Sequence, residues 1–226
     1  MLEDPAAWDE LKPFGIRMLP TVTRGGQYAN GQILRDVANL VGVDIGTQQM
    51  LSPTELVRRI NLILDGELRF FGQMPEEKMR GEVPGRPRSF ANLAWHTFNV
   101  IDAWLEYEVD GIALVNGSYA RNAPAGRDSK ADILAYGEDV KRRFNGWWTE
   151  HGATTDFDEP AETYYGEQSK HDFLERTTWH SGQHTRQMMM ILEDFIGVKP
   201  KEPLGPETWA GLPMPEKVWD DEKPIK

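Results

Sequence analysis

The sequence predicts a mainly α-helical protein whose centre is an up-down four-helix bundle. Four amphipathic patterns, each about 20 residues long or longer, follow one another between roughly residues 50 and 197. Each pattern is bounded by residues that typically start or stop helices, and no internal repeat interrupts the series. Four such helices bury their apolar faces most simply by packing against one another in a bundle.

The first of these helices begins at a strong start signal, Ser52-Pro53-Thr54-Glu55. Serine is a favoured N-cap, proline is favoured at the first helical position, and glutamate stands at the capping-box position. Pro75 and the stretch 81–88, which is rich in Gly, Pro and Arg, end the pattern. The apolar stripe between these signals consists of Leu56, Ile60, Ile63, Leu64, Phe70 and Phe71.

The other three helices follow in order, separated by turn-forming residues. The second is expected from about Ser89 to Val109 and the third from about Ser129 to Glu150. A long polar loop over 111–127, rich in Gly, Asn and Pro, separates them. The fourth runs from about Glu167 to Ile196 and stops at Gly197, a residue type that favours helix termination.

Two regions of different texture flank the bundle and divide the chain into segments 1–48, 49–197 and 198–226. The N-terminal segment reads as helix, strand, strand and helix, with turn chemistry at Arg24-Gly25-Gly26-Gln27. The C-terminal segment is Pro-rich but contains Trp209 and Trp219, so we expect it to lie across the bundle.

Composition excludes several classes of function. The formal net charge of −11, without a basic patch, speaks against nucleic-acid binding. No apolar run approaches the length of a membrane span, and the acidic N-terminus lacks the features of a signal peptide, so we expect a cytoplasmic protein. The absence of cysteine excludes disulfides, a cysteine nucleophile and thiolate metal ligands.

Two histidines of the fourth helix form a candidate metal-binding pair. His180 and His184 are four residues apart, which places both imidazoles on one helix face, one turn apart. Paired imidazoles at this spacing can chelate one metal ion. The pattern alone is also compatible with two hydrogen-bonded or surface histidines.

A third histidine strengthens the metal interpretation. His96 points in the same direction as the apolar residues of the second helix, so three imidazoles would face the core. Each buried imidazole needs a polar partner, and one shared metal ion would serve all three. His171 should face solvent, because it lies on the opposite side of the fourth helix from His180, and His151 is expected in a loop.

Three nitrogen ligands leave an open coordination position, which is typical of catalytic rather than structural metal sites. Zinc suits such a set best, while nickel, manganese and iron(II) are also compatible with it. The bound ion would act as a Lewis acid and would lower the pKa of a bound water or thiol.

At these residues the chain resembles the DinB/YfiT-like superfamily of metal-binding four-helix bundles. That family carries one histidine on its second helix and an HxxxHxxQ run on its fourth, which here are His96 and the run from His180 to Gln187. The resemblance covers about residues 50–197, and the segment 204–220 also looks like sequences that follow this bundle. It implies that Gln187 contacts a metal ligand rather than the metal itself, although a helix-packing role fits this glutamine equally well.

The resemblance also implies a class of chemistry. Characterised relatives include transferases and isomerases that use low-molecular-weight thiols such as mycothiol, bacillithiol or glutathione, with the metal activating the thiol. We therefore expect a metal-dependent thiol S-transferase or isomerase that acts on a small electrophile. One alternative is a non-enzymatic metal-binding or stress-response module that forms a homodimer. A weaker one is a metal-assisted hydrolase, which would need a carboxylate base that the sequence does not identify.

The N-terminal segment resembles the second half of a glutaredoxin or thioredoxin fold. Residues 15–22 look like the strand that carries the cis-proline of that fold, and residues 25–32 look like its hairpin and last turn. The first β-α-β unit and the redox cysteine are missing, so redox activity should be absent. Leu19 and Pro20 would help to bind a thiol if that function survives, although a structural remnant is simpler. The half-sheet would expose an edge that the bundle or a second copy covers, unless Met1 is not the true start.

Overall fold

The computed structural model describes residues 9, 11–15, 21–31, 33–43 and 50–219. These residues form two compact units. The first holds the described residues up to 43 together with Tyr164–Glu167, and the second holds the remainder from Met50 onward.

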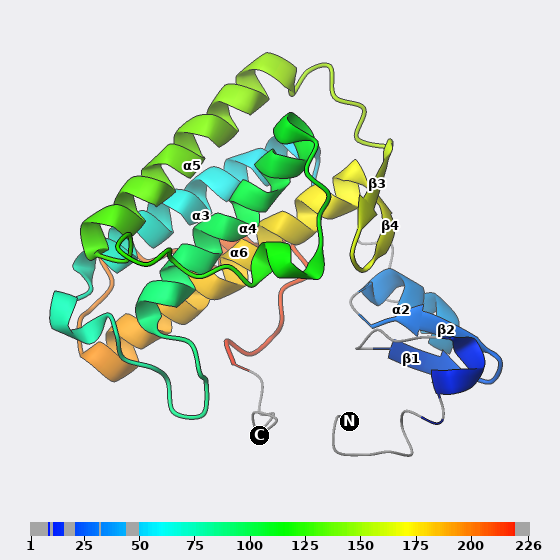
Figure 1. Cartoon of the computed structure of the whole chain (residues 1–226), viewed down its shortest axis with the longest axis horizontal. Helices are drawn as coiled ribbons and strands as arrows, with labels where there is room; N and C mark the ends of the chain where they lie inside the picture. The colour runs from blue at the N-terminus through cyan, green and yellow to red at the C-terminus, as the bar shows by residue number, and fades with distance from the viewer. Residues whose placement is uncertain (1–8, 10, 16–20, 32, 44–49, 220–226) are drawn as a thin grey trace. The chain divides into compact units, whose positions relative to one another are not determined.

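The first unit contains an antiparallel hairpin followed by a helix (Figure 1). Strands β1 (Thr21–Arg24) and β2 (Gln27–Asn30) pair with Thr21 opposite Asn30. The predicted turn joins them, and Gly25 in it has a φ of 58°, which glycine adopts without strain. Helix α2 (Leu34–Val41) follows, and a short 3-10 turn, η1 (Lys12–Phe14), precedes the hairpin.

The glutaredoxin-like interpretation of this segment stays a prediction. Leu19 and Pro20, to which thiol binding was assigned, lie outside the described residues. Within the unit, Asn30 Nδ2 donates a hydrogen bond to the backbone oxygen of Tyr165 at 2.6 Å.

The second unit is built on four long helices, and the mainly helical bundle expected from the sequence is confirmed (Figure 1). They are α3 (Pro53–Gln73), α4 (Phe90–Asp110), α5 (Lys130–His151) and α6 (Lys170–Met190).

All four helices begin in the same way. The residue before each first turn is a serine whose Oγ accepts a hydrogen bond from a backbone N–H in that turn. Such a cap contributes about 1 kcal/mol by satisfying an amide that would otherwise have no partner. The four capping residues are Ser52, Ser89, Ser129 and Ser169.

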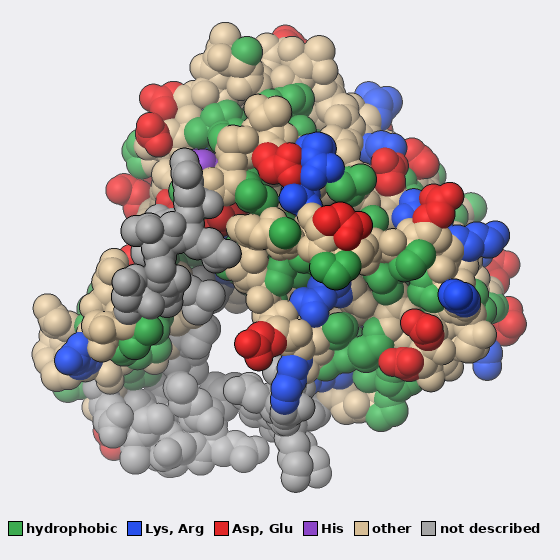
Figure 2. Space-filling view, turned by 180° about the vertical axis from the view of Figure 1, so that it is seen from behind, with side chains coloured by type: hydrophobic (Ala, Val, Ile, Leu, Met, Phe, Trp, Pro, Cys, Tyr) green, Lys and Arg blue, Asp and Glu red, His purple; other side chains and the backbone are tan. Residues whose placement is uncertain are grey.

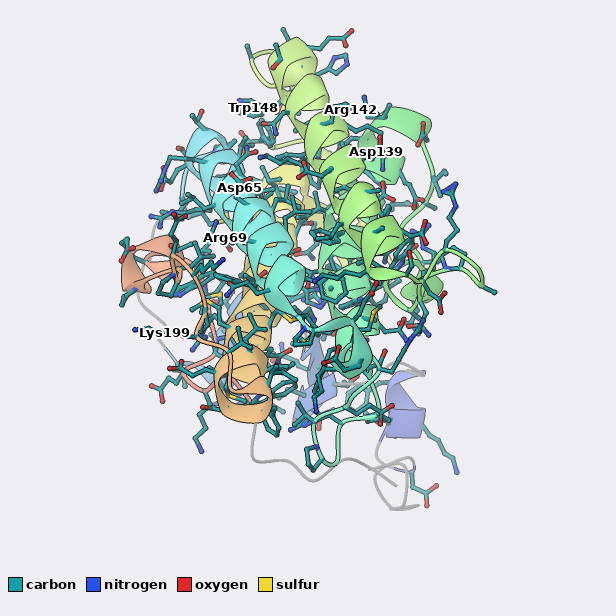
Figure 3. All side chains as sticks on the ribbon, turned by 90° about the vertical axis from the view of Figure 1, so that its left-hand side faces the viewer. Asp65, Arg69, Asp139, Arg142, Trp148 and Lys199 are labelled. Atoms are coloured by element: carbon teal, nitrogen blue, oxygen red, sulfur yellow. The ribbon has the colours of Figure 1, made fainter. Side chains whose placement is uncertain are left out.

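The helices pack so that α6 and α5 each contact both α3 and α4, which places α3 and α4 diagonally across the bundle. Figure 3 shows α3 and α5 side by side, with charged residues such as Asp65 and Asp139 along their outer faces. Helix α4 is buried from Phe90 to Leu105 except at Asn92, and the buried polar residues include His96, Asn99 and Asp102. The contact between α4 and α6 is the one that brings the predicted ligands together.

The fourth helix begins three residues later than predicted. Residues Gly166–Ser169 form strand β4, which pairs with β3 (Pro160–Thr163) in a hairpin that the sequence did not indicate. Few residues of this stretch are apolar, so the period-two pattern that marks a strand is absent. At its other end α6 continues into a π-helical segment, η4 (Ile191–Ile196).

Three short helical segments complete the unit. Turn η2 (Glu76–Lys78) follows α3, and η3 (Asn116–Tyr119) lies inside the predicted polar loop. A short helix, α7 (Pro206–Trp209), lies in the C-terminal segment.

His151 is the last residue of α5, so its predicted placement in a loop was wrong: the helix extends one residue further than the sequence indicated.

The C-terminal segment lies against α6. Gln183 Nε2 donates to the backbone oxygen of Val218 at 2.6 Å, and Arg186 Nη1 donates to that of Pro215 at 2.8 Å. These bonds anchor residues 215–218, which form no helix or strand.

Among the described residues no helix is both long enough and apolar enough to cross a membrane. On the face shown in Figure 2, acidic and basic side chains are intermingled.

Candidate metal centre

Helices α4 and α6 bring the three predicted histidines into one cluster. His96 comes from α4, and His180 and His184 come from successive turns of α6. One ring nitrogen of each lies within 4.8 Å of the corresponding nitrogens of the other two. The ring centroids are 4.7 Å apart for His96 and His184 and 5.3 Å apart for His96 and His180. The cluster could therefore hold one metal ion.

The hydrogen bonding of the cluster leaves one nitrogen of each ring without a partner. His96 Nδ1, His180 Nδ1 and His184 Nε2 are buried and make no hydrogen bond within the described part of the chain. Buried polar atoms normally have a partner, and three such atoms at one place call for a common one. Three imidazole nitrogens suit a divalent metal ion of the zinc, nickel or iron(II) type.

Burial also keeps the three imidazoles neutral, which is the form that binds a metal ion. Loss of solvent around the rings lowers the pKa of His96 to about 2 and that of His184 to about 4. The pKa of His180 falls well below its ordinary value for the same reason, reinforced by His184 and His96 beside it. The imidazoles are therefore neutral at neutral pH, and neutral imidazole is the ligand form.

Gln187 contacts the cluster directly. Its Oε1 lies 2.8 Å from His184 Nδ1, while its Nε2 donates to the backbone oxygen of Val218 at 3.1 Å. Because the amide oxygen accepts, His184 Nδ1 must carry the proton, and its lone pair is then on Nε2. That is the nitrogen without a partner, so Gln187 selects the tautomer that presents a lone pair to the cluster.

Tyr119 packs against the cluster, although the sequence gave no role to its loop. It lies in η3, is buried, and its ring meets that of His180 edge-on with centroids 5.3 Å apart. Its backbone hydrogen bond to His96 raises the pKa of that residue, against the larger effect of burial. The sequence feature that could have indicated this contact was an aromatic residue within a polar loop rich in Gly, Asn and Pro.

The two remaining histidines stay outside the cluster, as predicted. His151 is exposed at the end of α5. The expectation that His171 faces solvent was wrong: it is half-buried, and its Nε2 lies 2.8 Å from the backbone oxygen of Leu51. The segment that leads into α3 therefore covers this side of α6.

The sequence prediction did not identify the buried carboxyl group of Glu67. Glu67 stands on the core-facing side of α3 and is fully buried. Burial raises its pKa to about 8, with Thr185 acting in the opposite direction, so the group is mostly protonated at neutral pH. It does not belong to the histidine cluster. Glu67 stands seven residues after Ile60, within the apolar stripe, so its position in the sequence predicts that its side chain faces the core.

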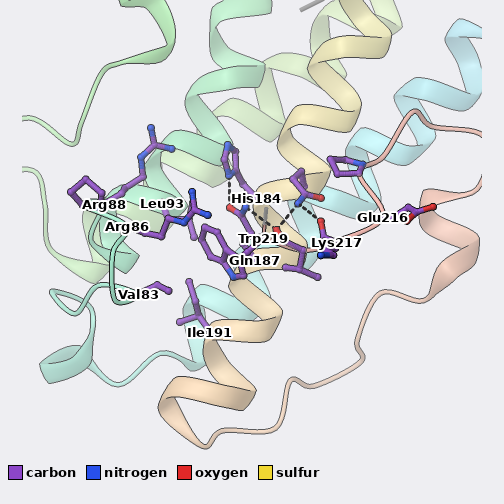
Figure 4. A pocket seen from close by; sticks show the side chains of 14 residues that line it. Val83, Arg86, Arg88, Leu93, His184, Gln187, Ile191, Glu216, Lys217 and Trp219 are labelled. Atoms are coloured by element: carbon purple, nitrogen blue, oxygen red, sulfur yellow. Dashed lines mark hydrogen bonds between the residues drawn. The ribbon is translucent and has the colours of Figure 1, made fainter. Parts of the chain in front are cut away.

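A cavity of about 840 Å³ opens beside the cluster (Figure 4). His184 and Gln187 form part of its wall, so a molecule in the cavity would lie next to the metal ligands. This volume suits a small organic molecule. Its other walls come from the loop before α4, from α4 and α6, and from the C-terminal segment: Val83, Arg86, Pro87, Arg88, Leu93, Gln183, Ile191, Pro215, Glu216, Lys217, Val218 and Trp219.

The fold and the cluster together define a helical bundle with a three-histidine site able to hold a metal ion. The sequence model of the DinB superfamily matches residues 67–188, which is more than half of the chain. The chain therefore belongs to the DinB superfamily, a family of metal-binding proteins. The matched span includes the three histidines and Gln187. A search of curated proteins finds no match to the chain.

Proposed function

We propose that this protein is a metal-dependent thiol transferase or isomerase that acts on a small electrophile. The observation that carries the proposal is the meeting of three unpartnered imidazole nitrogens beside a cavity of small-molecule size. A closed structural site would need a fourth protein ligand, and the acidic residues within the described ranges add none to the cluster.

The residues present fit a divalent metal, which when bound would lower the pKa of a thiol and so supply a thiolate. The chain contributes the neutral state of the imidazoles, through burial, and the tautomer of His184, through Gln187. Because the chain contains no cysteine, the reacting sulfur must come from a small thiol that enters the cavity.

The transfer balances without any oxidant or reductant. A bond forms between the thiol sulfur and an electrophilic carbon, the leaving group departs with its electron pair, and the thiol proton passes to water. In an isomerisation the thiol adds to the substrate, a bond rotates, and the thiol is released unchanged.

Metal-assisted hydrolysis has less support. It would need a carboxylate base near the ligands, and the buried carboxyl of Glu67 is protonated at neutral pH and lies outside the cluster.

Metal analysis is the first test. Wild-type protein should hold about one zinc or similar ion per chain, and a His180→Ala, His184→Ala double variant should hold none. His151→Ala is the matched control, because His151 is exposed and stands outside the cluster, and it should retain the metal. A wild-type protein that holds no metal after reconstitution would overturn the proposal.

Thiol binding is the second test. Titration of glutathione, and then of other low-molecular-weight thiols, onto the cobalt-substituted protein should change its visible spectrum. Consumption of the thiol in the presence of an electrophile should require the metal, and the protein itself adds no thiol background. An unchanged spectrum together with no turnover would favour a non-enzymatic metal-binding module.

A further inference from the structure

The cavity beside the histidines is lined by more basic than acidic residues, although the chain as a whole carries a net charge of −11. Three cations line it, Arg86, Arg88 and Lys217, against one carboxylate, that of Glu216. In Figure 4 the two arginines lie on one side of His184, and Glu216 lies on the other.

Arg88 is the cation that stands out. Several arginines of the bundle meet carboxylates, as Arg121 meets Glu106 at 2.5 Å and Arg143 meets Asp102 at 2.6 Å. Arg88 has no ion pair and no side-chain hydrogen bond among the described residues, and it lines the cavity, while partial burial lowers its pKa.

The charge of Arg88 acts on the metal ligands. It contributes to the lowered pKa of His96, His180 and His184, after burial as the main cause. Arg88 and His184 line the same cavity, so a small molecule held by Arg88 would lie beside the histidines.

The rest of the lining is largely apolar. Trp219 also lines the cavity, and the Arg86 guanidinium lies over its ring, 5.5 Å from the centroid. The side chains of Leu93, Ile191 and Val218 extend this wall. A molecule that complements the whole cavity therefore has an anionic end and an apolar body.

We propose that the cavity binds a small organic carboxylate with an apolar or aromatic body, and that Arg88 holds the carboxylate group. This inference rests on the proposed function and names the class of its substrate. The planar guanidinium can donate two parallel hydrogen bonds to a carboxylate, which fixes the orientation of the molecule as well as its position. The body then lies against Trp219, and the reactive carbon lies toward the histidines.

Binding of benzoate, compared with that of its neutral isostere benzamide, tests the proposal. Calorimetric titrations would use the zinc-loaded protein and the metal-free protein, because a carboxylate can also bind zinc directly. In both forms, Arg88→Gln should weaken benzoate binding about tenfold and leave benzamide binding unchanged. Arg88→Lys should restore part of the affinity, because it keeps the charge but not the paired donors.

The matched control is Arg127→Gln, which removes an exposed loop arginine that does not line the cavity and should leave benzoate binding unchanged. The proposal is overturned if benzoate does not bind, if benzamide binds equally well, or if Arg88→Gln binds benzoate as wild type does. Metal content and thiol turnover are measured separately. Loss of turnover with intact, Arg88-dependent benzoate binding would therefore remove the proposed reaction and leave the carboxylate site.

Discussion

Gln187 accepts a hydrogen bond from His184, with 2.8 Å between Oε1 and Nδ1, and so fixes which nitrogen of that ring carries the proton. Without this contact, the proton of His184 could move to Nε2 and block the position that a metal would take. The glutamine that the sequence suggested as a support for the ligands is thus in direct contact with one of them.

Replacement of this glutamine should weaken metal binding. We expect Gln187→Leu to lower zinc affinity about 10- to 100-fold, because His184 loses the partner that holds its tautomer. Competition with a chelating dye would measure the change. Gln183→Leu is the matched control, since Gln183 also bonds the backbone of Val218 but makes no hydrogen bond to a histidine among the described residues. Equal losses in the two variants would show that the C-terminal segment, not His184, accounts for the effect.

Metal removal should destabilise the fold, because an ion that binds only the folded state shifts the unfolding equilibrium. Zinc at about 1,000 times its dissociation constant would add about 4 kcal/mol to the free energy of unfolding. Thermal unfolding with zinc and with a chelator would measure the difference. The His180→Ala, His184→Ala variant should unfold at the same temperature in both conditions, and a zinc-dependent shift in that variant would place the ion elsewhere.

The buried carboxyl group of Glu67 should make the stability of the fold decrease as the pH rises. Its pKa is raised from 4.5 to about 8 in the fold, so between these values the folded chain keeps a proton that the unfolded chain releases. The stabilisation is fully present below pH 4.5 and is lost as the pH rises to 8, by at most about 1.4 kcal/mol per pH unit. Glu67→Gln, which is neutral at every pH, should remove this slope.

Urea denaturation at pH 5 and pH 8 would measure the effect of Glu67 as a difference between variant and wild type. The gain in stability of Glu67→Gln over wild type should be larger at pH 8 than at pH 5. Glu77→Gln, a change at an exposed carboxyl group, serves as the control. An unchanged difference between the two pH values would mean that Glu67 is ionised throughout.

Helices α4 and α5 approach closely at Gly137. A Cβ atom built there would lie 2.6 Å from Cζ of Phe98, which is fully buried. Gly137→Ala should therefore destabilise the protein by about 1–3 kcal/mol, through displacement of the ring. Gly146→Ala, in the same helix but with open space around its Cβ, should instead stabilise it by about 0.5–1 kcal/mol. Chemical denaturation of the two variants would compare them, and equal effects would contradict the close approach.

The elements that the sequence predicted correctly depend on local signals. The helix starts at Ser52, Ser89 and Ser129 follow from a capping side chain and the pattern just after it, so they required no knowledge of the fold. The histidine cluster was also accessible, because helical spacing fixes the directions of His180 and His184.

What the sequence did not predict depends on contacts between distant segments. Arg88 lines the cavity beside His184, and Tyr119 packs against His180, from two loops whose paths no periodic pattern describes. Strands β3 and β4 form a hairpin from a mostly polar stretch, where alternation of apolar and polar residues is absent. Glu67 was visible in the stripe of α3, but only the packed bundle shows that no water reaches it.

The bond from Gln187 to Val218 gives the C-terminal segment an indirect connection to the metal ligands. If docking of this segment holds Gln187 in place for His184, then docking and metal affinity must favour each other to the same extent. The colour of a cobalt-loaded sample would then report on the state of a segment whose described residues make no hydrogen bond to a histidine. A C-terminal purification tag, or proteolytic trimming near Val218, would lower metal occupancy with every histidine still in place.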